Sequence, residues 1–156
     1  MANLLTLVKP GNQQSAPMRT IPQILNDSKT IAVVGMSAKP ERASHGVAQY
    51  LQKHGYRVIP VNPSYAGQDI LGEKVYASLI DAAAALSATG ARIDVVDCFR
   101  KAEEMLPVAR DAVAVRAGCL WMQLGVANQA AADLAKAAGL DVVMDHCIKI
   151  EHAALR

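Results

Sequence analysis

Short apolar runs alternate with longer amphipathic stretches along most of the chain. The apolar runs predict β-strands, and the stretches whose apolar residues recur every three or four positions predict helices between them. Residues 64–77 hold two glycines and predict a loop, and Pro107 predicts a break or kink in the helix that contains it. The expected strands cover residues 30–35, 57–61, 93–98, 119–123 and 141–144. The expected helices cover residues 22–26, 44–54, 78–87, 101–117 and 128–138, with a last helical turn from His146.

This alternation predicts an α/β fold. Strands that are apolar at nearly every position are typical of a parallel sheet with both faces covered. Right-handed crossovers then give a Rossmann-like, doubly wound, five-stranded parallel sheet with helices on both faces, and we expect the strand order 3-2-1-4-5. We expect residues 18–156 to form one domain and residues 1–17 to be a mobile tail.

The composition narrows the classes of function. Hydrophobic residues make up 52% of the chain but aromatic residues only 4%, which indicates an aliphatic core. The formal charge of +2 is spread along the chain, which argues against a nucleic-acid-binding module. Apolar runs are shorter than the roughly 20 residues of a spanning helix, so we expect no membrane partner. Three cysteines without a disulfide-like spacing favour the cytoplasm. A homo-oligomer stays open, with Trp121 or the alanine-rich helix faces as candidate contacts.

In folds of this class the ligand lies beyond the carboxyl ends of the strands, near the point where the strand order reverses. The segments that follow the five expected strands are residues 35–44, 62–65, 98–100, 123–126 and 145–147. These segments are rich in polar, cationic and turn residues, whereas the opposite strand ends supply few. The candidate site is therefore this edge of the sheet.

The loop after the first strand predicts an anion site. Gly35 permits a tight turn and a close approach of the backbone to phosphate. Ser37 and Ser44 bring hydroxyl groups, and Lys39 and Arg42 bring positive charge. A strand, a glycine turn and a helix that we expect to be capped near Ser44 also present backbone N–H groups to an anion.

The dinucleotide fingerprint is incomplete at this loop. It needs three spaced glycines after the first strand and an acidic residue at the end of the second. Only Gly35 is present, and the second strand ends in Asn62 and Pro63. Ordinary NAD binding is therefore not expected.

Several segments resemble the small single-domain CoA-binding proteins, the YccU-like group, which are similar to the CoA-binding domain of the succinyl-CoA synthetase α subunit. The matching segments are residues 34–44, 50–58, 60–63, 70–79, 93–100, 121–125 and 143–147. The resemblance implies a Rossmann-like domain that binds coenzyme A or an acyl-CoA through its nucleotide end. By the same resemblance, the phosphates would contact Gly35, Ser37, Lys39, Pro40 and Arg42.

The resemblance also implies that Asn62 and Pro63 flank the adenosine, and that Phe99 and Arg100 close the other side of the site. Met36, Ser44, Cys98 and Gln123 stand in the same strand-end segments, and we include them in the expected cofactor site. Coenzyme A carries a pyrophosphate and a 3′-phosphate, whose charge Lys39, Arg42 and Arg100 would offset.

The sequence favours a binding protein over an enzyme, because it holds no evident set of nucleophile, base and acid. Two enzymatic alternatives stay open: an NADP- or other nucleotide-dependent enzyme, and a thiol-reactive protein that processes acyl-CoA with Cys147. A protein–protein interaction module with a vestigial site is a third reading. Cys147 and Cys98 follow strands at the ligand edge, where either thiol could form a mixed disulfide with CoA. Cys119 opens a strand at the far edge and is expected to be a core thiol.

Overall fold

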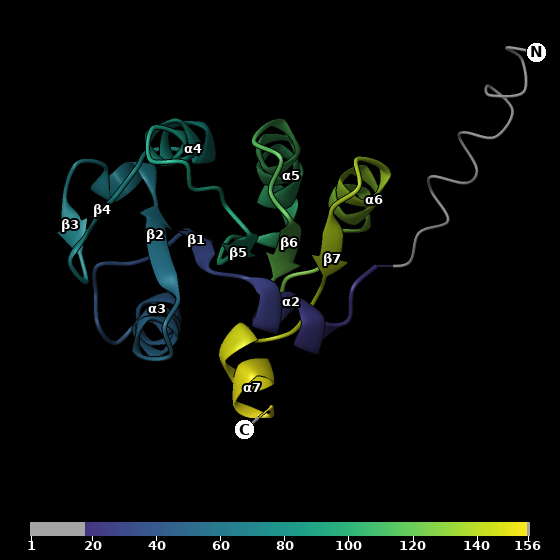
Figure 1. Ribbon diagram of the computed structural model, residues 1–156, viewed down its shortest axis with the longest axis horizontal. Coiled ribbons are helices and arrows are strands. Elements are labelled where there is room, and N and C mark those ends of the chain that lie inside the picture. Colours follow the sequence, from purple (N-terminus) through teal and green to yellow (C-terminus); the bar gives the residue numbers. More distant parts are fainter. Residues whose placement is uncertain (1–17, 156) are drawn as a thin grey trace, which may run out of the picture.

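The computed structural model describes residues 18–155 and contains a five-stranded parallel sheet with helices on both faces (Figure 1). The strands are β1 (Thr30–Val34), β2 (Arg57–Val61), β5 (Val95–Cys98), β6 (Cys119–Met122) and β7 (Asp141–Val143). All four neighbouring pairs run parallel. The Rossmann-like α/β fold expected from the sequence is confirmed. The expected tail, residues 1–17, lies outside the described residues.

The expected strand order was wrong in one respect. The sheet runs β2-β1-β5-β6-β7, so the third long strand joins β1 rather than the outer side of β2. The outer side of β2 is occupied by the segment at Tyr76, which forms a parallel bridge with Val61. Asn62 N donates to Tyr76 O, and Tyr76 N donates to Pro60 O. This short bridge occupies the outer edge of β2, and the next long strand, β5, pairs with β1 on the other side.

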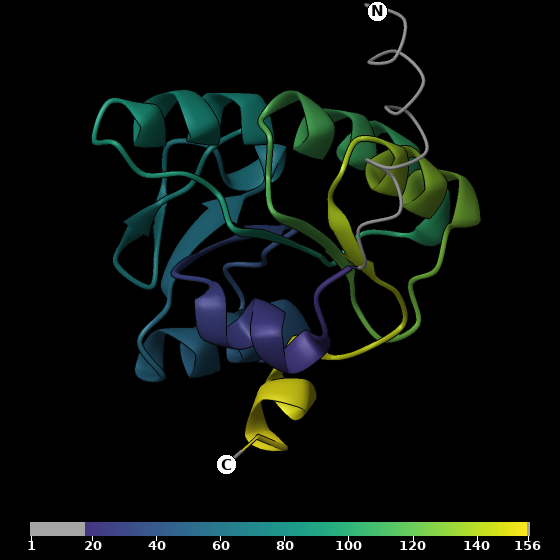
Figure 2. The ribbon, with the colours of Figure 1, turned by 45° about the vertical axis from the view of Figure 1, so that its right-hand side comes forward.

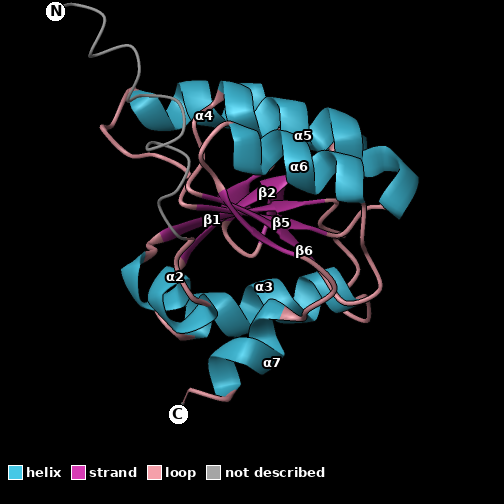
Figure 3. Ribbon diagram, turned by 90° about the vertical axis from the view of Figure 1, so that its right-hand side faces the viewer, coloured by secondary structure: helices cyan, strands magenta, loops and turns pink. Residues whose placement is uncertain are grey.

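The helices form one layer on each side of the sheet (Figure 3). One layer holds α4 (Leu79–Ser87), α5 (Met105–Ala114) and α6 (Gln129–Ala137), and the other holds α2 (Ile21–Asp27), α3 (Ala43–Lys53) and α7 (Ile148–Ala153). Successive side chains of β1 point to opposite faces. Ala32 and Val34 accordingly pack in the core under the first layer, and Ile31 and Val33 in the core under the second. In Figure 2, α2 and α7 lie on the same side of the sheet as α3.

Several helices begin where the sequence predicts. Ser78 and Asn128 cap α4 and α6, each accepting a hydrogen bond from a backbone N–H three residues on. Ser44 does not cap α3, because the N-cap is Arg42 and Ser44 is the second helical residue. The helix expected over residues 101–117 is divided into a short 3₁₀ segment, Ala102–Glu104, and α5. Pro107 lies in the first turn of α5, where no N–H is needed.

The segment expected to be a loop contains short structured pieces. A 3₁₀ turn, Pro63–Tyr65, follows β2 and leads to a small hairpin of β3 (Asp69–Ile70) and β4 (Glu73–Lys74). Trp121 was one of two candidates for a dimer contact, but it is completely buried and its Nε1 donates to His146 O, so its side chain is not available for one. Within residues 18–155, the helices are all too short or too polar to cross a membrane.

Candidate functional site

The strand order reverses between β1 and β5. From β1 the chain continues through α3 to β2 on one side, whereas β5 lies on the other side and leads to β6 and β7. Crossovers that leave in opposite directions part at this point and open a crevice at the carboxyl edge. The segments that flank the crevice are residues 35–42 after β1 and residues 99–101 after β5. Both belong to the edge that the sequence indicates.

Gly35 holds these two segments close together. Its φ of +85° is left-handed, and an added Cβ would lie 2.4 Å from Phe99 O and 3.0 Å from Phe99 C. Gly35 N donates to Val61 O at 2.8 Å, and Phe99 N donates to Val34 O at 2.8 Å. Gly35 therefore lies where three strands end, and only a residue without a side chain fits there.

The loop after β1 is held by its own side chains. Ser37 N donates to Ser44 Oγ at 2.9 Å, and Lys39 N donates to Ser37 Oγ at 3.0 Å. These two N–H groups already have partners, although a sequence reading leaves them available to an anion. Each serine oxygen accepts through a lone pair, so its hydroxyl hydrogen remains able to donate to a ligand. Hydrogen bonds within the loop thus hold its conformation.

Asn62 fixes the other side of the loop. Its side chain is buried, its Nδ2 donates to Met36 O at 2.9 Å, and its Oδ1 accepts from Ser64 N at 3.0 Å. The Met36 side chain is also fully buried and packs in the core. Both residues therefore lie at the site as supports of the loop, while Pro63 next to them is exposed.

Four cations surround the crevice. Lys39 and Arg42 are exposed on the loop after β1, and Arg100 and Lys101 follow β5. None of the four forms an ion pair with a carboxylate of residues 18–155. The first three are among the site residues expected from the sequence, and Lys101 is not. Unpaired positive charge at a helix start and a glycine turn favours a ligand with several negative charges.

Three cavities meet along this edge. The loop cavity, of about 210 Å³, is lined by Gly35, Ser37, Arg42, Ala43, Ser44 and Phe99. The small cavity, of about 130 Å³, is lined by Val34, Val61, Pro63, Ala77, Ser78, Leu79, Arg100, Val108 and Asp111. The apolar cavity, of about 540 Å³, is lined by Ala43, Val47, Phe99, Arg100, Lys101, Gln123, Leu124, Val126, Cys147 and Ile150. Shared walls make the three cavities neighbours: Ala43 and Phe99 join the loop cavity to the apolar cavity, and Arg100 joins the apolar cavity to the small one.

Gln123 positions the far wall of the apolar cavity. Its Oε1 accepts from Ile148 N at 3.0 Å, which fixes the start of α7. Asp145 Oδ1 accepts from Gly125 N at 2.7 Å and ties the loop after β6 to the loop after β7. The sequence places both loops at the ligand edge, but the contribution of Val47 and Ile150 to one cavity depends on how α3 and α7 pack.

The three thiols lie in different environments. Cys147 is half-buried, precedes α7 and lines the apolar cavity. Cys98 is completely buried, and its thiol donates to Val96 O, so the structure does not place this thiol at the ligand edge. Burial raises the pKa of Cys98 well above its ordinary value and also raises the pKa of Cys119. Cys119 is a core residue, as the sequence predicts.

We therefore expect only Cys147 to react with a disulfide reagent in the folded protein. Thiolates are the nucleophiles, and burial both suppresses ionisation and blocks access at Cys98 and Cys119. Intact-mass measurement after incubation with oxidised CoA should show at most one adduct, and Cys147→Ser should remove it. Unfolding in denaturant should make all three thiols reactive. An adduct on folded Cys147→Ser protein would contradict this assignment.

Metal chemistry has no evident ligand set here. Within the described part of the chain, histidine, cysteine and carboxylate side chains do not form any group of three or more that could hold a metal ion. The crevice presents instead cations and hydroxyl groups beside apolar walls.

Comparison with known proteins identifies the family. A family described as "CoA binding domain" matches residues 29–153, which include every strand of the sheet and all three cavities. The chain belongs to this CoA-binding domain family. It is also 38% identical over 143 residues to the uncharacterized protein YneT of Bacillus subtilis (strain 168), a match that covers 92% of this chain and 99% of YneT.

Solved structures agree with this membership. A structure from Thermus thermophilus, titled cell-free ID.343, is 35% identical with a TM-score of 0.79, and the match covers 87% of this chain and 96% of that one. A hypothetical protein from Pyrococcus horikoshii OT3 is 37% identical with a TM-score of 0.78, covering 91% and 94% of the two chains. The likeness therefore extends over nearly the whole of these small proteins.

Proposed function

We propose that this protein binds coenzyme A or an acyl-CoA through its nucleotide and phosphate end, as a cytoplasmic binding domain without catalytic machinery of its own. The observation that carries the proposal is the crevice between β1 and β5, where a glycine loop held by its own hydrogen bonds and four unpaired cations adjoin cavities on both sides. Membership of the CoA-binding domain family supports the choice of ligand.

The cavities suggest how an elongated ligand lies. The phosphates occupy the loop cavity, where the hydroxyl hydrogens of Ser37 and Ser44 and the guanidinium of Arg42 face them. The adenosine lies against Pro63 at the small cavity, whose wall offers the Asp111 carboxylate as an acceptor for the adenine amino group. The pantetheine arm then leaves past Ala43 and Phe99 into the apolar cavity.

This arrangement suits coenzyme A better than a nicotinamide dinucleotide. A dinucleotide ribose is ordinarily held by a carboxylate at the end of the second strand. At that position Asn62 is buried and its side chain is engaged with Met36 O and Ser64 N. A thiol-reactive role remains the second candidate function, favoured by the place of Cys147 in the wall of the apolar cavity.

A ligand panel tests the proposal. Thermal unfolding would be followed with CoA, dephospho-CoA, NADP and ATP at equal concentration, since a ligand that binds only the folded state raises its stability. We expect CoA to stabilise most, and dephospho-CoA less because it lacks the 3′-phosphate. Arg42→Ala should weaken CoA binding by about 1.5–3 kcal/mol, the usual contribution of a charge-assisted hydrogen bond, which raises Kd by about 10-fold to 150-fold as measured by calorimetry.

Arg110→Ala is the matched control, because Arg110 is an exposed arginine on α5 that lines none of the three cavities described. It should leave the affinity for CoA unchanged. Equal stabilisation by CoA and dephospho-CoA would show that the 3′-phosphate does not contribute to binding. Stabilisation by NADP but not by CoA would favour the nucleotide-dependent enzyme instead.

A further inference from the structure

The apolar cavity is large for the arm of a cofactor alone. Its volume of about 540 Å³ lies within the range of cavities that enclose whole small-molecule ligands. Its polar wall residues are Arg100, Lys101 and Gln123. The Gln123 side chain is already engaged with Ile148 N, and Arg100 also lines the small cavity. The remaining walls are apolar apart from the Cys147 thiol.

Two wall residues are unusually exposed. Leu124 is 64% exposed and Ile150 is 59% exposed, the highest fractions among the large hydrophobic residues of the described chain. They come from different elements, the loop after β6 and helix α7, and yet line one cavity. Neighbouring apolar side chains in water are typical of a binding surface. An apolar ligand group in the cavity would cover both.

The cavity is continuous with the proposed phosphate site. Ala43 and Phe99 contribute to both the loop cavity and the apolar cavity. A ligand held by its phosphates therefore has an apolar chamber directly next to it. Arg100 and Lys101 follow Phe99 in sequence and bring positive charge to this shared boundary, whereas Leu124, Val126 and Ile150 belong to the segments after β6 and β7.

We propose that the apolar cavity takes the uncharged aliphatic acyl group of an acyl-CoA, so that the preferred ligand is an aliphatic acyl-CoA rather than free CoA or a dicarboxylic acyl-CoA. The inference rests on the proposed function, because the phosphate end must first be held at the glycine loop. Arg100 and Lys101 stand next to Phe99 at the boundary with the loop cavity, whereas the wall beyond them is built of Leu124, Val126 and Ile150. An aliphatic chain gains by covering these apolar side chains, and they offer no polar partner to a terminal carboxylate, which disfavours charged acyl groups.

A series of acyl-CoA ligands tests the inference. Calorimetry would compare CoA with acetyl-, butyryl-, hexanoyl-, octanoyl- and succinyl-CoA at one ionic strength. A buried methylene contributes about 0.8 kcal/mol, which corresponds to a threefold to fourfold lower Kd per carbon. We expect the affinity to rise by this factor with chain length until the cavity is filled, and then to level off. Succinyl-CoA should bind at least tenfold more weakly than butyryl-CoA, which has the same number of acyl carbons.

A pair of variants locates the effect. Ile150→Ser should reduce the ratio of the affinity for hexanoyl-CoA to the affinity for CoA by threefold or more. The comparison is a ratio because Ile150 also lines the cavity that the pantetheine arm of CoA enters. Ile80→Ser is the matched control, since Ile80 is also an exposed isoleucine in a helix, 45% exposed on α4, and it lines none of the cavities described. It should alter neither affinity.

The outcomes separate the inference from the proposed function. If CoA binds but longer acyl chains add no affinity, or if succinyl-CoA binds more tightly than butyryl-CoA, the acyl assignment is overturned while the CoA site stands. If neither CoA nor any acyl-CoA binds, the proposed function fails and the acyl assignment fails with it. An equal loss in Ile80→Ser and Ile150→Ser would also overturn the placement of the acyl group.

Discussion

Gly35→Ala is expected to lower the free energy of unfolding by about 2–4 kcal/mol and to abolish measurable CoA binding. Two physical costs combine at this position. Alanine disfavours a φ of +85°, and its Cβ would lie 2.4 Å from Phe99 O. That carbonyl cannot move aside easily, because Phe99 N is hydrogen-bonded to Val34 O at the end of β1. Relief of the clash must therefore separate the two segments that form the crevice.

Gly67→Ala is the control that isolates the steric cost. Gly67 has nearly the same φ, +86°, but an added Cβ there meets nothing within 4 Å. We expect it to cost only about 1–2 kcal/mol, the price of a left-handed conformation for a residue with a side chain. Urea denaturation measures the stability of both variants, and calorimetry with CoA measures binding. Equal destabilisation of the two variants, with binding intact in Gly35→Ala, would show that the close approach to Phe99 is unimportant.

The local signals in the sequence predicted most of the elements. Ser78 and Asn128 start α4 and α6 as expected, because a capping side chain acts on a backbone N–H only three residues away. The apolar runs located all five long strands to within about two residues. Such signals depend on neighbours in the chain, so they can be read without knowledge of the fold.

The errors came from long-range pairing. No local feature of the sequence indicates that the segment at Tyr76 pairs with β2 and occupies its outer edge. The expected strand order was therefore wrong. The thiol of Cys98 was expected at the ligand edge because it ends a strand, but its face of the strand packs in the core. The face of a terminal strand residue depends on packing, which a continuously apolar run does not reveal.

The residues of the candidate site also fall into two groups, those that local sequence signals predict and those that depend on long-range packing. The glycine loop, its serines and Arg42 could be predicted because they follow a strand in one short segment. Ser44 does lie beside the loop, but its expected role as the cap of α3 was wrong. Its hydroxyl oxygen accepts from Ser37 N instead. The apolar cavity could not be predicted, because its walls come from α3, α7 and three separate loops. Those walls meet only through tertiary packing.

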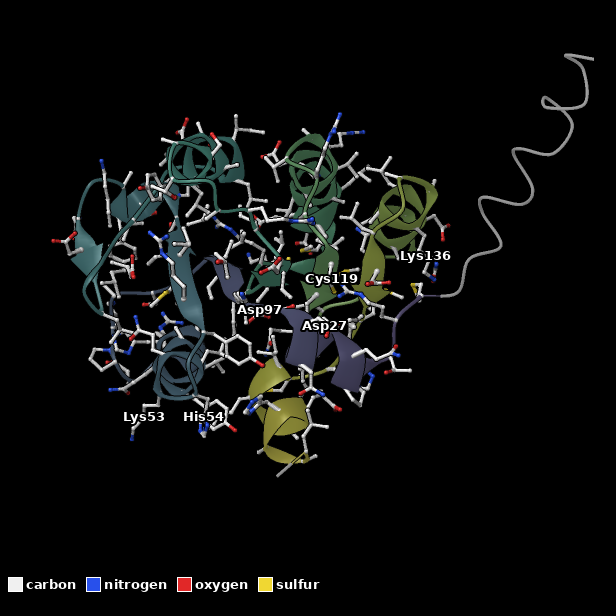
Figure 4. The ribbon with its side chains drawn as sticks, viewed as in Figure 1. Asp27, Lys53, His54, Asp97, Cys119 and Lys136 are labelled. Atoms are coloured by element: carbon white, nitrogen blue, oxygen red, sulfur yellow. The ribbon has the colours of Figure 1, made fainter. Side chains whose placement is uncertain are left out.

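Asp97→Asn is expected to stabilise the folded protein at neutral and alkaline pH. Asp97 lies on β5 in the interior of the molecule (Figure 4), and it is completely buried. Its neighbours in register are Val33 and Trp121. Neither carboxylate oxygen has a hydrogen-bond partner among the described residues. Burial raises the pKa of Asp97 well above its ordinary value of 3.8, because an apolar surrounding disfavours the charged form.

The direction of the pH dependence follows from proton binding. Above pH 3.8 the unfolded chain releases the proton of Asp97, whereas the folded protein retains it until the pH reaches the raised pKa. Over that window the folded state binds more protons, so its stability falls as the pH rises. Asparagine has nearly the same shape and no proton to retain. Relative to the unsubstituted protein, the variant should therefore gain about 1.4 kcal/mol for each pH unit between 3.8 and the raised pKa, and this gain should shrink towards pH 4.

Asp94→Asn is the matched control, three residues earlier in the chain. The Asp94 carboxylate accepts hydrogen bonds from Lys29 N at 2.8 Å and Thr30 N at 3.0 Å, and it lies 3.8 Å from Arg92 Nε. Loss of its charge weakens bonds that the native state makes, so this variant should be destabilised at pH 8. Denaturant unfolding between pH 4 and pH 8 would measure both. A gain in Asp97→Asn that stays constant across this range would mean that Asp97 carries no raised pKa, whereas a loss at pH 8 would mean that its carboxylate has a stabilising partner.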